Sequence, residues 1–351
     1  GGGTMGAGIA AACRNAGLPV VLIERDEAAV ERARSTLEKL FAGALKRGKL
    51  SEADYAERLA GVTATSDYAK LADCDLVIEA VFEDIGVKRN VFAELDRHCR
   101  SDAILATNTS YLDPREIAVD LSNPERFIGL HFFSPAHIMK LLEIVPTPET
   151  APDVLASAFA LGRQLGKIPV QAGICEGFIG NRILKRYRAE AESLIEEGVA
   201  ISDIDAAMRG FGFKMGPFEA QDLGGLDIAY LQREGARATG QDVPETLGDI
   251  LVKAGRKGQK TGGGWYDYAD GDRTPRSSAT VTELLGARIG DAASDLSQEQ
   301  IAERLVGAMA AEGQAILDEG IAGQAVDIDL VEIHGYGFPR WKGGPMFCAE
   351  Q

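Results

Sequence analysis

The chain has 351 residues, 45% of them hydrophobic and 26% charged, and its formal net charge at pH 7 is −16. This length allows about two domains of roughly 150 residues each. The acidic balance argues against a surface for nucleic acid or anionic membranes, because such surfaces need clustered Lys and Arg. We find no apolar run long enough to span a bilayer and no signal-peptide pattern. The five cysteines are scattered, which indicates reduced thiols in a cytosolic-type compartment, and a total of four histidines argues against a structural metal site.

The first ten residues, GGGTMGAGIA, form a glycine-rich motif in which Gly1, Gly3 and Gly6 fit the pattern G-x-G-x-x-G. A helix of small residues is predicted next, followed by a β-branched strand, LPVVLIE. The strand ends in Glu24, 18 residues after Gly6, close to the ~20 expected for an acid that binds a ribose. These features predict a dinucleotide site, because the glycines let the backbone approach a pyrophosphate at a helix N-terminus. Glu24 favours NAD over NADP, since a 2′-phosphate would meet like charge, although the adjacent Arg25 softens that preference.

Beyond this motif, predicted helices and strands alternate. Short apolar strands between helices are typical of a mostly parallel sheet covered on both faces, an α/β fold of the Rossmann type, which binds ligands at the carboxyl ends of its strands. The long charged helix is predicted at about residues 27–49, and later strands at 74–81, 103–108, 126–133 and 141–145. A glycine turn of this kind normally follows a central strand. We therefore expect a strand ahead of Gly1 and an N-terminus that has been clipped. The final residues, FCAEQ, do not resemble a natural C-terminus either.

Polar residues suited to hydride-transfer chemistry follow the predicted strands. His131 and Glu143 lie at the ends of neighbouring strands, Ser110 lies in the stretch TNTSYL, and Asn181 opens a long predicted helix. An enzyme that oxidises an alcohol needs a base for the hydroxyl proton, and a neutral His suits this role near pH 7. A carboxylate behind the His fixes its tautomer, and small polar side chains can hydrogen-bond the substrate oxygen. The spacing alone leaves open that His131 is a satisfied core residue.

Five motifs occur in order along the chain: GxGTMGAGIA, DLVIEAVFEDIGVKRNVFAELD, TNTSYL, HFFSPAHIMKLLEIV and GFIGNRIL. With them the sequence resembles the L-3-hydroxyacyl-CoA dehydrogenases of fatty-acid β-oxidation over nearly its whole length. The resemblance implies that His131 is the catalytic base and Glu143 its partner. It also implies that Ser110 and Asn181 help around the substrate oxygen.

The resemblance further implies an NAD site. Glu83 and Lys88 would line it near the nicotinamide ribose, and Asn108 would lie in the same pocket. The family usually has Asp where this chain has Glu24, and the longer side chain can alter the ribose geometry. The candidate cofactor residues are therefore Gly1, Gly3, Thr4, Met5, Gly6, Glu24, Glu83, Lys88 and Asn108.

The implied reaction is the reversible, NAD-dependent oxidation of an L-3-hydroxyacyl-CoA to the 3-ketoacyl-CoA, an activity of the EC 1.1.1.35 type. CoA is a polyanion, so an acidic chain needs a local basic site for it. The predicted helix at 37–50 supplies four cations where the family has a helical excursion over the CoA, and a solvated helix face is the equally open alternative. These candidates are Lys39, Lys46, Arg47 and Lys49.

The second half of the sequence is helical and contains an internal repeat. Residues 196–218 and 318–346 share an EG pair, a DID triplet, a GFGF or GYGF motif and a GP pair, in the same order. One copy alone would expose an apolar face, which single-copy members of the family cover by dimerising. We therefore expect the two copies to pack as a pseudo-dimer and this portion to be monomeric.

The predicted architecture is a Rossmann-type domain followed by an all-α domain in two tandem copies. Its limits are an NAD-binding domain at 1–172, a first helical domain at 173–268, a linker at 269–296 and a second helical repeat at 297–351. The glycine-rich stretch at 255–268 does not match a Walker A spacing, and we interpret it as a structural connection. The two-copy arrangement resembles the dehydrogenase part of multifunctional β-oxidation enzymes, which carry an enoyl-CoA hydratase domain in front. By the same analogy a thiolase is a possible partner.

Two other functions remain open from the sequence. One is a related dehydrogenase that acts on a free hydroxy acid without CoA. The other is a non-catalytic NAD-binding or crystallin-like protein, against which the set of His131, Glu143, Ser110 and Asn181 counts. A bacterial-type cytoplasmic location is expected, with a peroxisome or the mitochondrial matrix as alternatives.

Overall fold

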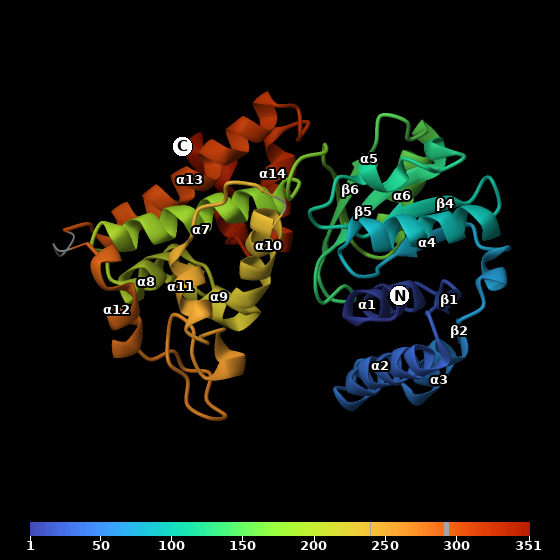
Figure 1. Cartoon of the computed structure of the whole chain (residues 1–351), viewed down its shortest axis with the longest axis horizontal. Helices are drawn as coiled ribbons and strands as arrows, with labels where there is room; N and C mark the ends of the chain where they lie inside the picture. Colours follow the sequence, from blue (N-terminus) through green and yellow to red (C-terminus); the bar gives the residue numbers. More distant parts are fainter. Residues whose placement is uncertain (239, 291–294) are drawn as a thin grey trace. The chain divides into compact units, whose positions relative to one another are not determined.

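The structure, a computed structural model, describes residues 1–238, 240–290 and 295–351. These residues form two compact units, each described here by itself (Figure 1). The first, which we call the sheet unit, comprises residues 1–182 and 314–336. The second, the helical unit, comprises residues 183–313 and 337–351. Residues 314–336, which the sequence placed in the second helical repeat, thus cluster with the sheet.

The sheet unit alternates strands and helices in chain order. All five predicted strands are present, and the structure adds β2, in which two of four residues are Thr, and β7, which contains Pro169, a residue that argues against a strand in a sequence pattern. The elements are α1 (Thr4–Asn15), β1 (Val20–Ile23), α2 (Glu27–Lys46), α3 (Glu52–Ala60), β2 (Val62–Thr65), β3 (Leu76–Glu79), α4 (Ile85–His98), β4 (Ile104–Thr107), α5 (Pro114–Ala118), β5 (Phe127–Phe132), β6 (Leu141–Pro146), α6 (Pro152–Gln164), β7 (Ile168–Gln171) and α14 (Ala325–Gly335).

The strands form two sheets, with the orders β1-β2 and β3-β4-β5-β6-β7. All neighbouring pairs are parallel except β5 and β6, which are antiparallel. Among the described residues, β1 pairs only with β2, and β3 at its edge pairs only with β4. One edge of β1 and one edge of β3 are therefore left without a ladder partner in the described chain.

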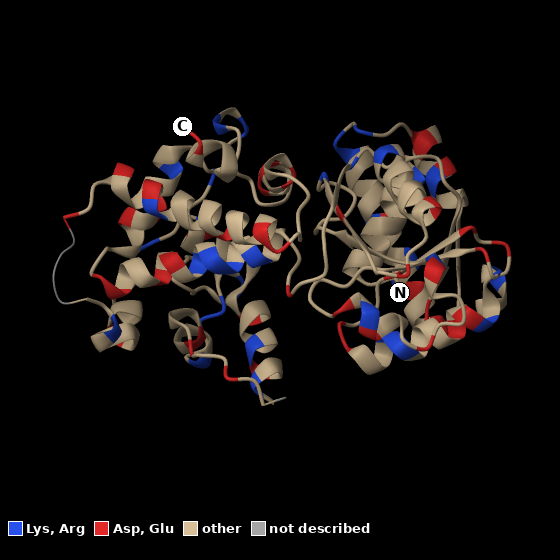
Figure 2. Ribbon diagram, turned by 90° about the horizontal axis from the view of Figure 1, so that it is seen from above, with Lys and Arg blue, Asp and Glu red and all other residues tan. Residues whose placement is uncertain are grey.

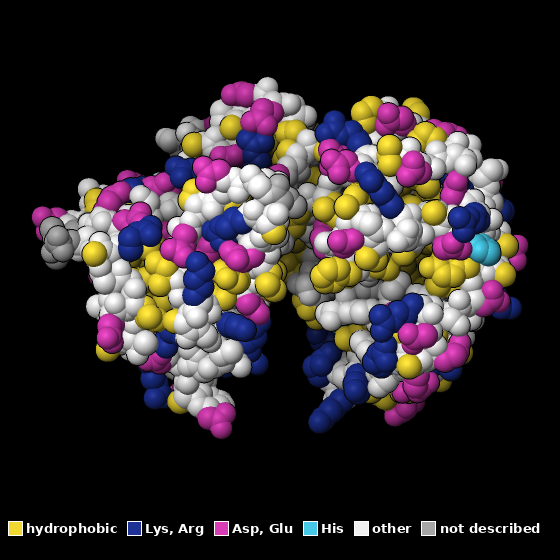
Figure 3. Space-filling view, viewed as in Figure 1, with side chains coloured by type: hydrophobic (Ala, Val, Ile, Leu, Met, Phe, Trp, Pro, Cys, Tyr) yellow, Lys and Arg dark blue, Asp and Glu magenta, His cyan; other side chains and the backbone are white. Residues whose placement is uncertain are grey.

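A cavity of about 1600 Å³ lies between these two edges. Consecutive residues of β1 and of β3 line it, together with the glycine turn and part of α1. In Figure 3 a band of hydrophobic side chains crosses this face of the unit between the positions of α4 and α1, and Phe82 and Val87 are exposed apolar residues of the lining. Six of the candidate cofactor residues line this cavity: Gly1, Gly3, Thr4, Met5, Gly6 and Glu24.

Helix α1 is built from small residues because it is packed on two sides. One side lies in a cluster with Leu22, Leu37 and Phe41, which belong to β1 and α2. The other contributes Ile9 to the core over β5 and β6. A Cβ added at Gly8 would lie 3.2 Å from the Cβ of Ala136, so a larger residue would force the backbones apart.

The helical unit continues the chain after β7. It contains no strand among its described residues and is made of α7 (Gly180–Glu196), α8 (Ile201–Phe211), α9 (Pro217–Gly224), α10 (Leu226–Ala238), α11 (Leu247–Lys253), α12 (Ala279–Leu285), α13 (Gln298–Asp318) and α15 (Pro345–Ala349), of which α7 and α13 also extend into the sheet unit. The predicted linker at 269–296 includes α12, and residues 291–294 of that prediction lie outside the described chain.

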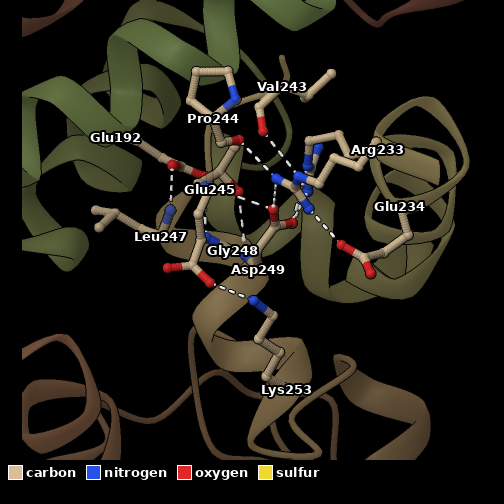
Figure 4. A network of polar contacts seen from close by, with 12 residues as sticks. Glu192, Arg233, Glu234, Val243, Pro244, Glu245, Leu247, Gly248, Asp249 and Lys253 are labelled. Carbon is tan, nitrogen blue, oxygen red and sulfur yellow. Dashed lines mark hydrogen bonds and ion pairs between the residues drawn. The ribbon is translucent and has the colours of Figure 1, made fainter. Parts of the chain in front are cut away.

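A polar network joins α7, α10 and α11 (Figure 4). The buried carboxylate of Asp249 accepts hydrogen bonds from Arg233 and Arg237, and it also pairs with Thr246 in a capping box at the start of α11. Glu192 of α7 accepts the backbone amide of Leu247 over 2.7 Å. Because a buried carboxylate needs several donors, this network fixes how the three helices meet.

The stretch at 255–268 is held by the buried Asp222 of α9. Its carboxylate accepts the backbone amides of Trp265 and Tyr266 and the hydroxyl of Tyr268. A Cβ at Gly264 would lie 1.8 Å from an oxygen of Asp222, so the glycine is required by this close approach. The contacts support the interpretation of this stretch as a structural connection.

Figure 2 shows Lys and Arg interspersed with Asp and Glu on the helices of both units. Within the described residues, no helix is both long enough and apolar enough to cross a membrane. None of the five cysteines, all of which are described, takes part in a disulfide.

Candidate active site

His131 and Glu143 face each other across the antiparallel pair of β5 and β6. They are direct partners in the register of the two strands, so their side chains lie on the same face of the sheet. His131 Nδ1 lies 2.6 Å from Glu143 Oε2, and the side chains are 4% and 0% exposed. An imidazole whose Nδ1 hydrogen is donated to a carboxylate has Nε2 available as a proton acceptor.

The second oxygen of Glu143 lies at the N-terminus of α7. Oε1 accepts the backbone amides of Ile179 and Gly180 over 3.1 and 3.0 Å. These amides and the helix dipole stabilise a buried negative charge. Gly177 and Phe178 just before the helix have φ values of +80° and +53°, and this left-handed turn aims the amides at the carboxylate. Both oxygens of Glu143 therefore have hydrogen-bond partners within the protein.

Lys88 is the centre of a second buried network, at the carboxyl ends of β3 and β4. Its ammonium group, 0% exposed, lies 2.8 Å from Glu79 and 3.2 Å from Glu83. Glu79 also accepts the hydroxyl of Thr107 over 2.7 Å. Sequence reasoning found Glu83 and Lys88 and missed Glu79 and Thr107. The signal for Glu79 was a carboxylate placed at the end of an apolar strand.

Glu83 ties this network to the loop after β4. It accepts hydrogen bonds from the hydroxyl of Thr109 and the amides of Ser110 and Tyr111. Burial raises the pKa of Glu83, but the Lys88 charge and these hydrogen bonds outweigh it and hold the pKa below its ordinary value. Glu83 therefore carries a negative charge that positions Ser110.

The other predicted residues around the substrate oxygen lie at the same edge of the sheet. Thr107, the last residue of β4, is opposite Gly129 of β5 in this parallel pair. The loop after β4, which contains Ser110, therefore begins beside the end of β5, the strand that carries His131. Asn108 is buried there, and its Oδ1 accepts the backbone amide of Phe132 over 2.8 Å. Asn181 follows Gly180 in the first turn of α7. Of the four predicted catalytic residues, His131 and Glu143 contact each other, the amide of Ser110 binds Glu83, and Asn181 adjoins Gly180, whose amide binds Glu143.

The glycine turn has the shape that a dinucleotide requires. A Cβ at Gly6 would lie 1.7 Å from the carbonyl oxygen of Gly1, whereas a Cβ at Gly3 would meet no atom within 4 Å. The turn is closed on the protein side and open at the N-cap of α1, where no described side chain caps the helix. Open amide groups at this end of a helix bind phosphate, so the residues present fit the pyrophosphate of NAD. Thr4 and Met5 form the first turn beside this opening.

Glu24 follows the end of β1, close to the glycine turn. One of its oxygens accepts the backbone amide of Gly2, and the other accepts the amide of Arg25 over 3.2 Å. The side chain is half-buried, and the pocket around it is also lined by Gly1 and Gly3. A carboxylate placed here can accept hydrogen bonds from a ribose and repels a phosphate. The predicted CoA candidates Lys39, Lys46, Arg47 and Lys49 are exposed around the end of α2.

The C-terminal segment 314–336 brings two further side chains close to Glu143 and Asn181. Neither of them was predicted from the sequence. Helix α14 packs against β6 and β7. It carries Glu332, which is 1% exposed and interacts electrostatically with Glu143. Tyr336 follows α14 and donates a hydrogen bond from its hydroxyl to Asn181. Tyr336 belongs to the repeated GYGF motif, and its position 155 residues after Asn181 gave no local signal.

Comparison with known proteins agrees with this arrangement. Residues 1–175 match the NAD binding domain of 3-hydroxyacyl-CoA dehydrogenase, and residues 177–268 match its C-terminal domain. The peroxisomal bifunctional enzyme of Cavia porcellus is 39% identical over 372 residues, which cover 99% of this chain and 50% of that protein. The chain therefore spans about half the length of the curated relatives it matches.

Solved structures give the same result. The 3-hydroxybutyryl-CoA dehydrogenase of Escherichia coli K12 has a TM-score of 0.83 and 29% identity, covering 97% of this chain and 89% of that chain. FadB2 of M. tuberculosis has a TM-score of 0.71 and 36% identity, covering 77% of this chain and 97% of that chain. The predicted Rossmann-like NAD-binding domain and helical C-terminal domain are thereby confirmed. The chain belongs to the 3-hydroxyacyl-CoA dehydrogenase family.

Proposed function

We propose that this protein interconverts L-3-hydroxyacyl-CoA and 3-ketoacyl-CoA with NAD as the redox partner, as a step of fatty-acid β-oxidation. The observation that carries the proposal is the buried pair of His131 and Glu143 at 2.6 Å, with both oxygens of Glu143 hydrogen-bonded. Such a pair supplies a base of fixed tautomer at the edge of the sheet where the family's NAD-binding domain presents its cofactor.

His131 takes the proton. Its Nδ1 hydrogen is donated to Glu143, so Nε2 accepts the proton from the 3-hydroxyl group as the carbonyl forms. The imidazolium that results is stabilised by the Glu143 carboxylate, which the α7 amides keep in place. In the reverse direction, the same Nε2 returns the proton to the 3-keto oxygen. Ser110 and Asn181 donate hydrogen bonds that orient this oxygen.

The cofactor residues hold NAD by its three polar parts. Gly1, Gly3 and Gly6, with the amides of Thr4 and Met5, bind the pyrophosphate at the start of α1. Glu24 binds the hydroxyls of the adenosine ribose. On the nicotinamide side the site is formed by Glu83, Lys88 and Asn108. Bound there, NAD would supply the nicotinamide that accepts the hydride leaving C3 of the 3-hydroxyacyl substrate.

We assign the CoA contact to the exposed cations around the end of α2. A chain with a net charge of −16 repels CoA except where cations gather, and α2 presents them at one end. The contributing residues are Lys39, Lys46, Arg47 and Lys49.

The decisive experiment is NADH oxidation with acetoacetyl-CoA by the wild type and by His131→Gln. We expect kcat to fall by about 10²–10⁴-fold in the variant, because the base is lost while the fold is kept. His98→Gln, at the exposed C-terminal end of α4, is the matched control and should retain wild-type kcat.

Three results would contradict the proposal. If His131→Gln were as active as the wild type, His131 would not be the base. If free acetoacetate were turned over as well as acetoacetyl-CoA, the protein would be the related dehydrogenase that does not require CoA. A wild-type protein that binds NADH and turns over neither compound would be a non-catalytic NAD-binding protein.

We also propose the domain division into residues 1–172, 173–268, 269–296 and 297–351, with the last part a second copy of the helical domain. Two similarities support the second copy. Helices α8 and α14 each have 11 residues, and α9 and α15, the next α-helices after them, both begin with a Pro that follows a Gly. The two copies pack as a pseudo-dimer, and this portion is a monomer. Sedimentation at equilibrium tests this, since a concentration-dependent dimer would contradict it.

The whole protein is proposed to be a multifunctional enzyme. Its curated relatives are about twice as long as this chain, and the names printed for them include bifunctional and multifunctional enzymes. An enoyl-CoA hydratase domain in front of this portion and a thiolase partner fit this assignment. We place the protein in the bacterial-type cytoplasm, with the peroxisome and the mitochondrial matrix as the alternatives.

A further inference from the structure

Tyr336 holds the carboxamide of Asn181 in one orientation. Its hydroxyl donates to Oδ1 of Asn181 over 2.8 Å. The oxygen and nitrogen of a carboxamide lie at opposite ends of one planar group, so a donor that takes the oxygen decides where the NH₂ group points.

The ring of Tyr336 is itself fixed by close contacts. It packs edge-on against Phe133, with centroids 5.7 Å apart and an interplanar angle of 79°, and Phe133 packs against the ring of His131 at 4.3 Å. A Cβ at Gly180 would lie 2.2 Å from a ring carbon of Tyr336, so Gly180 makes room for the ring. The backbone amide of Tyr336 donates a hydrogen bond to the backbone carbonyl of Glu332 at the end of α14.

These contacts connect Tyr336 to the reaction through two neighbours. Gly180, which accommodates the ring, donates its own amide to Glu143. Asn181 is the next residue in the chain. Displacement of the tyrosine would therefore act directly on Asn181, which its hydroxyl contacts, and only indirectly, through Gly180 and Phe133, on the pair of His131 and Glu143.

We propose that Tyr336 is a positioning residue for the dehydrogenase reaction, which orients the Asn181 amide so that its NH₂ group donates to the substrate oxygen. This inference rests on the proposed function. Residue 336 lies outside the stretches that match the two family domains, at 1–175 and 177–268. The C-terminal segment 314–336 thus supplies a part of the active site that these two domains lack.

The first test is a double-mutant cycle on acetoacetyl-CoA reduction with NADH. Tyr336→Phe keeps the ring and removes the donor, and we expect kcat to fall about 10–100-fold with KM for acetoacetyl-CoA changed less than about threefold. In an Asn181→Ala background, Tyr336→Phe should change kcat less than about twofold, because the group through which it acts is gone. Tyr55→Phe on α3 is the matched control and should behave as wild type.

Losses that multiply in the double variant would overturn the inference, since Tyr336 would then act independently of Asn181. So would a Tyr336→Phe enzyme with wild-type kcat. If the wild type itself did not reduce acetoacetyl-CoA, the proposed function would fail, and the orientation would be decided by the second test.

The second test needs no turnover. Protein labelled with ¹⁵N only at asparagine gives side-chain NH₂ signals, among which that of Asn181 is identified by its loss in Asn181→Asp. We expect Tyr336→Phe to shift or broaden the Asn181 signal and to leave that of Asn15 unchanged, because the carboxamide loses its fixed orientation. An unchanged Asn181 signal in folded Tyr336→Phe protein would overturn the inference.

Discussion

Both oxygens of Glu143 are occupied, one by Nδ1 of His131 and the other by two amides at the start of α7. A buried carboxylate held by three donors in this way can stabilise an imidazolium that forms beside it. The same site holds a second carboxyl group, Glu332, in electrostatic contact with Glu143. Two adjacent buried anions would repel each other, so the protonation of one depends on the other.

Glu332 should make the stability of the protein fall as pH rises. One of its oxygens has no hydrogen-bond partner among the described residues. Burial, and then the charges of Glu143 and Asp329, raise its pKa well above the ordinary value. The folded state thus keeps a proton that the unfolded chain releases above about pH 4.3. The stabilisation is complete below that pH and is lost as pH rises toward the folded pKa.

We therefore expect Glu332→Gln to be more stable than the wild type at pH 7 and close to it at pH 4.5. The difference should be about 1–3 kcal/mol in the free energy of unfolding, measured with urea. Glu303→Gln, at an exposed position of α13, is the control and should follow the wild type at both pH values. If Glu332→Gln also followed the wild type, the carboxyl group would be ionised in the folded protein.

At the scale of elements, the glycine turn and α1 act as one piece. Gly6 lets the first turn of α1 close on the carbonyl of Gly1, and Gly3 leaves the N-terminus of the helix open. The two glycines serve different purposes, although they belong to one motif. The first allows the fold, and the second allows a ligand to approach.

Alanine at these two positions should separate the purposes. Gly6→Ala would place a Cβ 1.7 Å from a backbone oxygen, so we expect a loss of stability of about 3 kcal/mol or more. Gly3→Ala meets no protein atom and should keep the free energy of unfolding within about 0.5 kcal/mol of wild type. It should weaken NADH binding about tenfold or more, because its Cβ points to where the pyrophosphate approaches. Fluorescence titration measures NADH affinity, and thermal unfolding measures stability. A Gly3→Ala protein that binds NADH as tightly as the wild type would contradict this description of the site.

At the scale of the whole molecule, the cavity between β1 and β3 is the least ordinary feature. Backbone donors and acceptors along a strand edge are normally paired in a ladder or exposed to water, and neither of these two edges has a ladder partner among the described residues. The prediction of a strand ahead of Gly1 stays a prediction. The two edges and the lining residues give it a location, because a strand placed there would pair with both.

An extension of about five β-branched residues directly before Gly1 should therefore stabilise the protein. Burial of its side chains, less the entropy of ordering it, predicts a gain of about 2–4 kcal/mol in the free energy of unfolding. Backbone amides of β1 and β3 should also exchange more slowly with solvent. A Gly-Ser extension of equal length is the control, and equal effects of the two extensions would contradict a strand in the cavity.

Local patterns were enough to predict much of this protein. Short strands of mostly apolar residues, the glycine turn and the carboxylate of Glu24 are features of short stretches, because side-chain alternation and turn chemistry depend on near neighbours. The motifs around His131 and Glu143 also stand out in the sequence. Strands β2 and β7 escaped prediction because half of the residues of β2 are Thr and β7 contains Pro169, and pairing with a neighbouring strand stabilises both.

The sequence by itself determined the alternation of elements, the family and the candidate residues. Only the tertiary structure decided that β5 and β6 run antiparallel with His131 opposite Glu143, and that the start of α7 supplies amides to Glu143. It alone decided that α14 packs on β6 and β7, bringing Glu332 and Tyr336 to the site. The physical reason is that register and burial depend on contacts between residues far apart in the chain, whose free energies no local pattern contains.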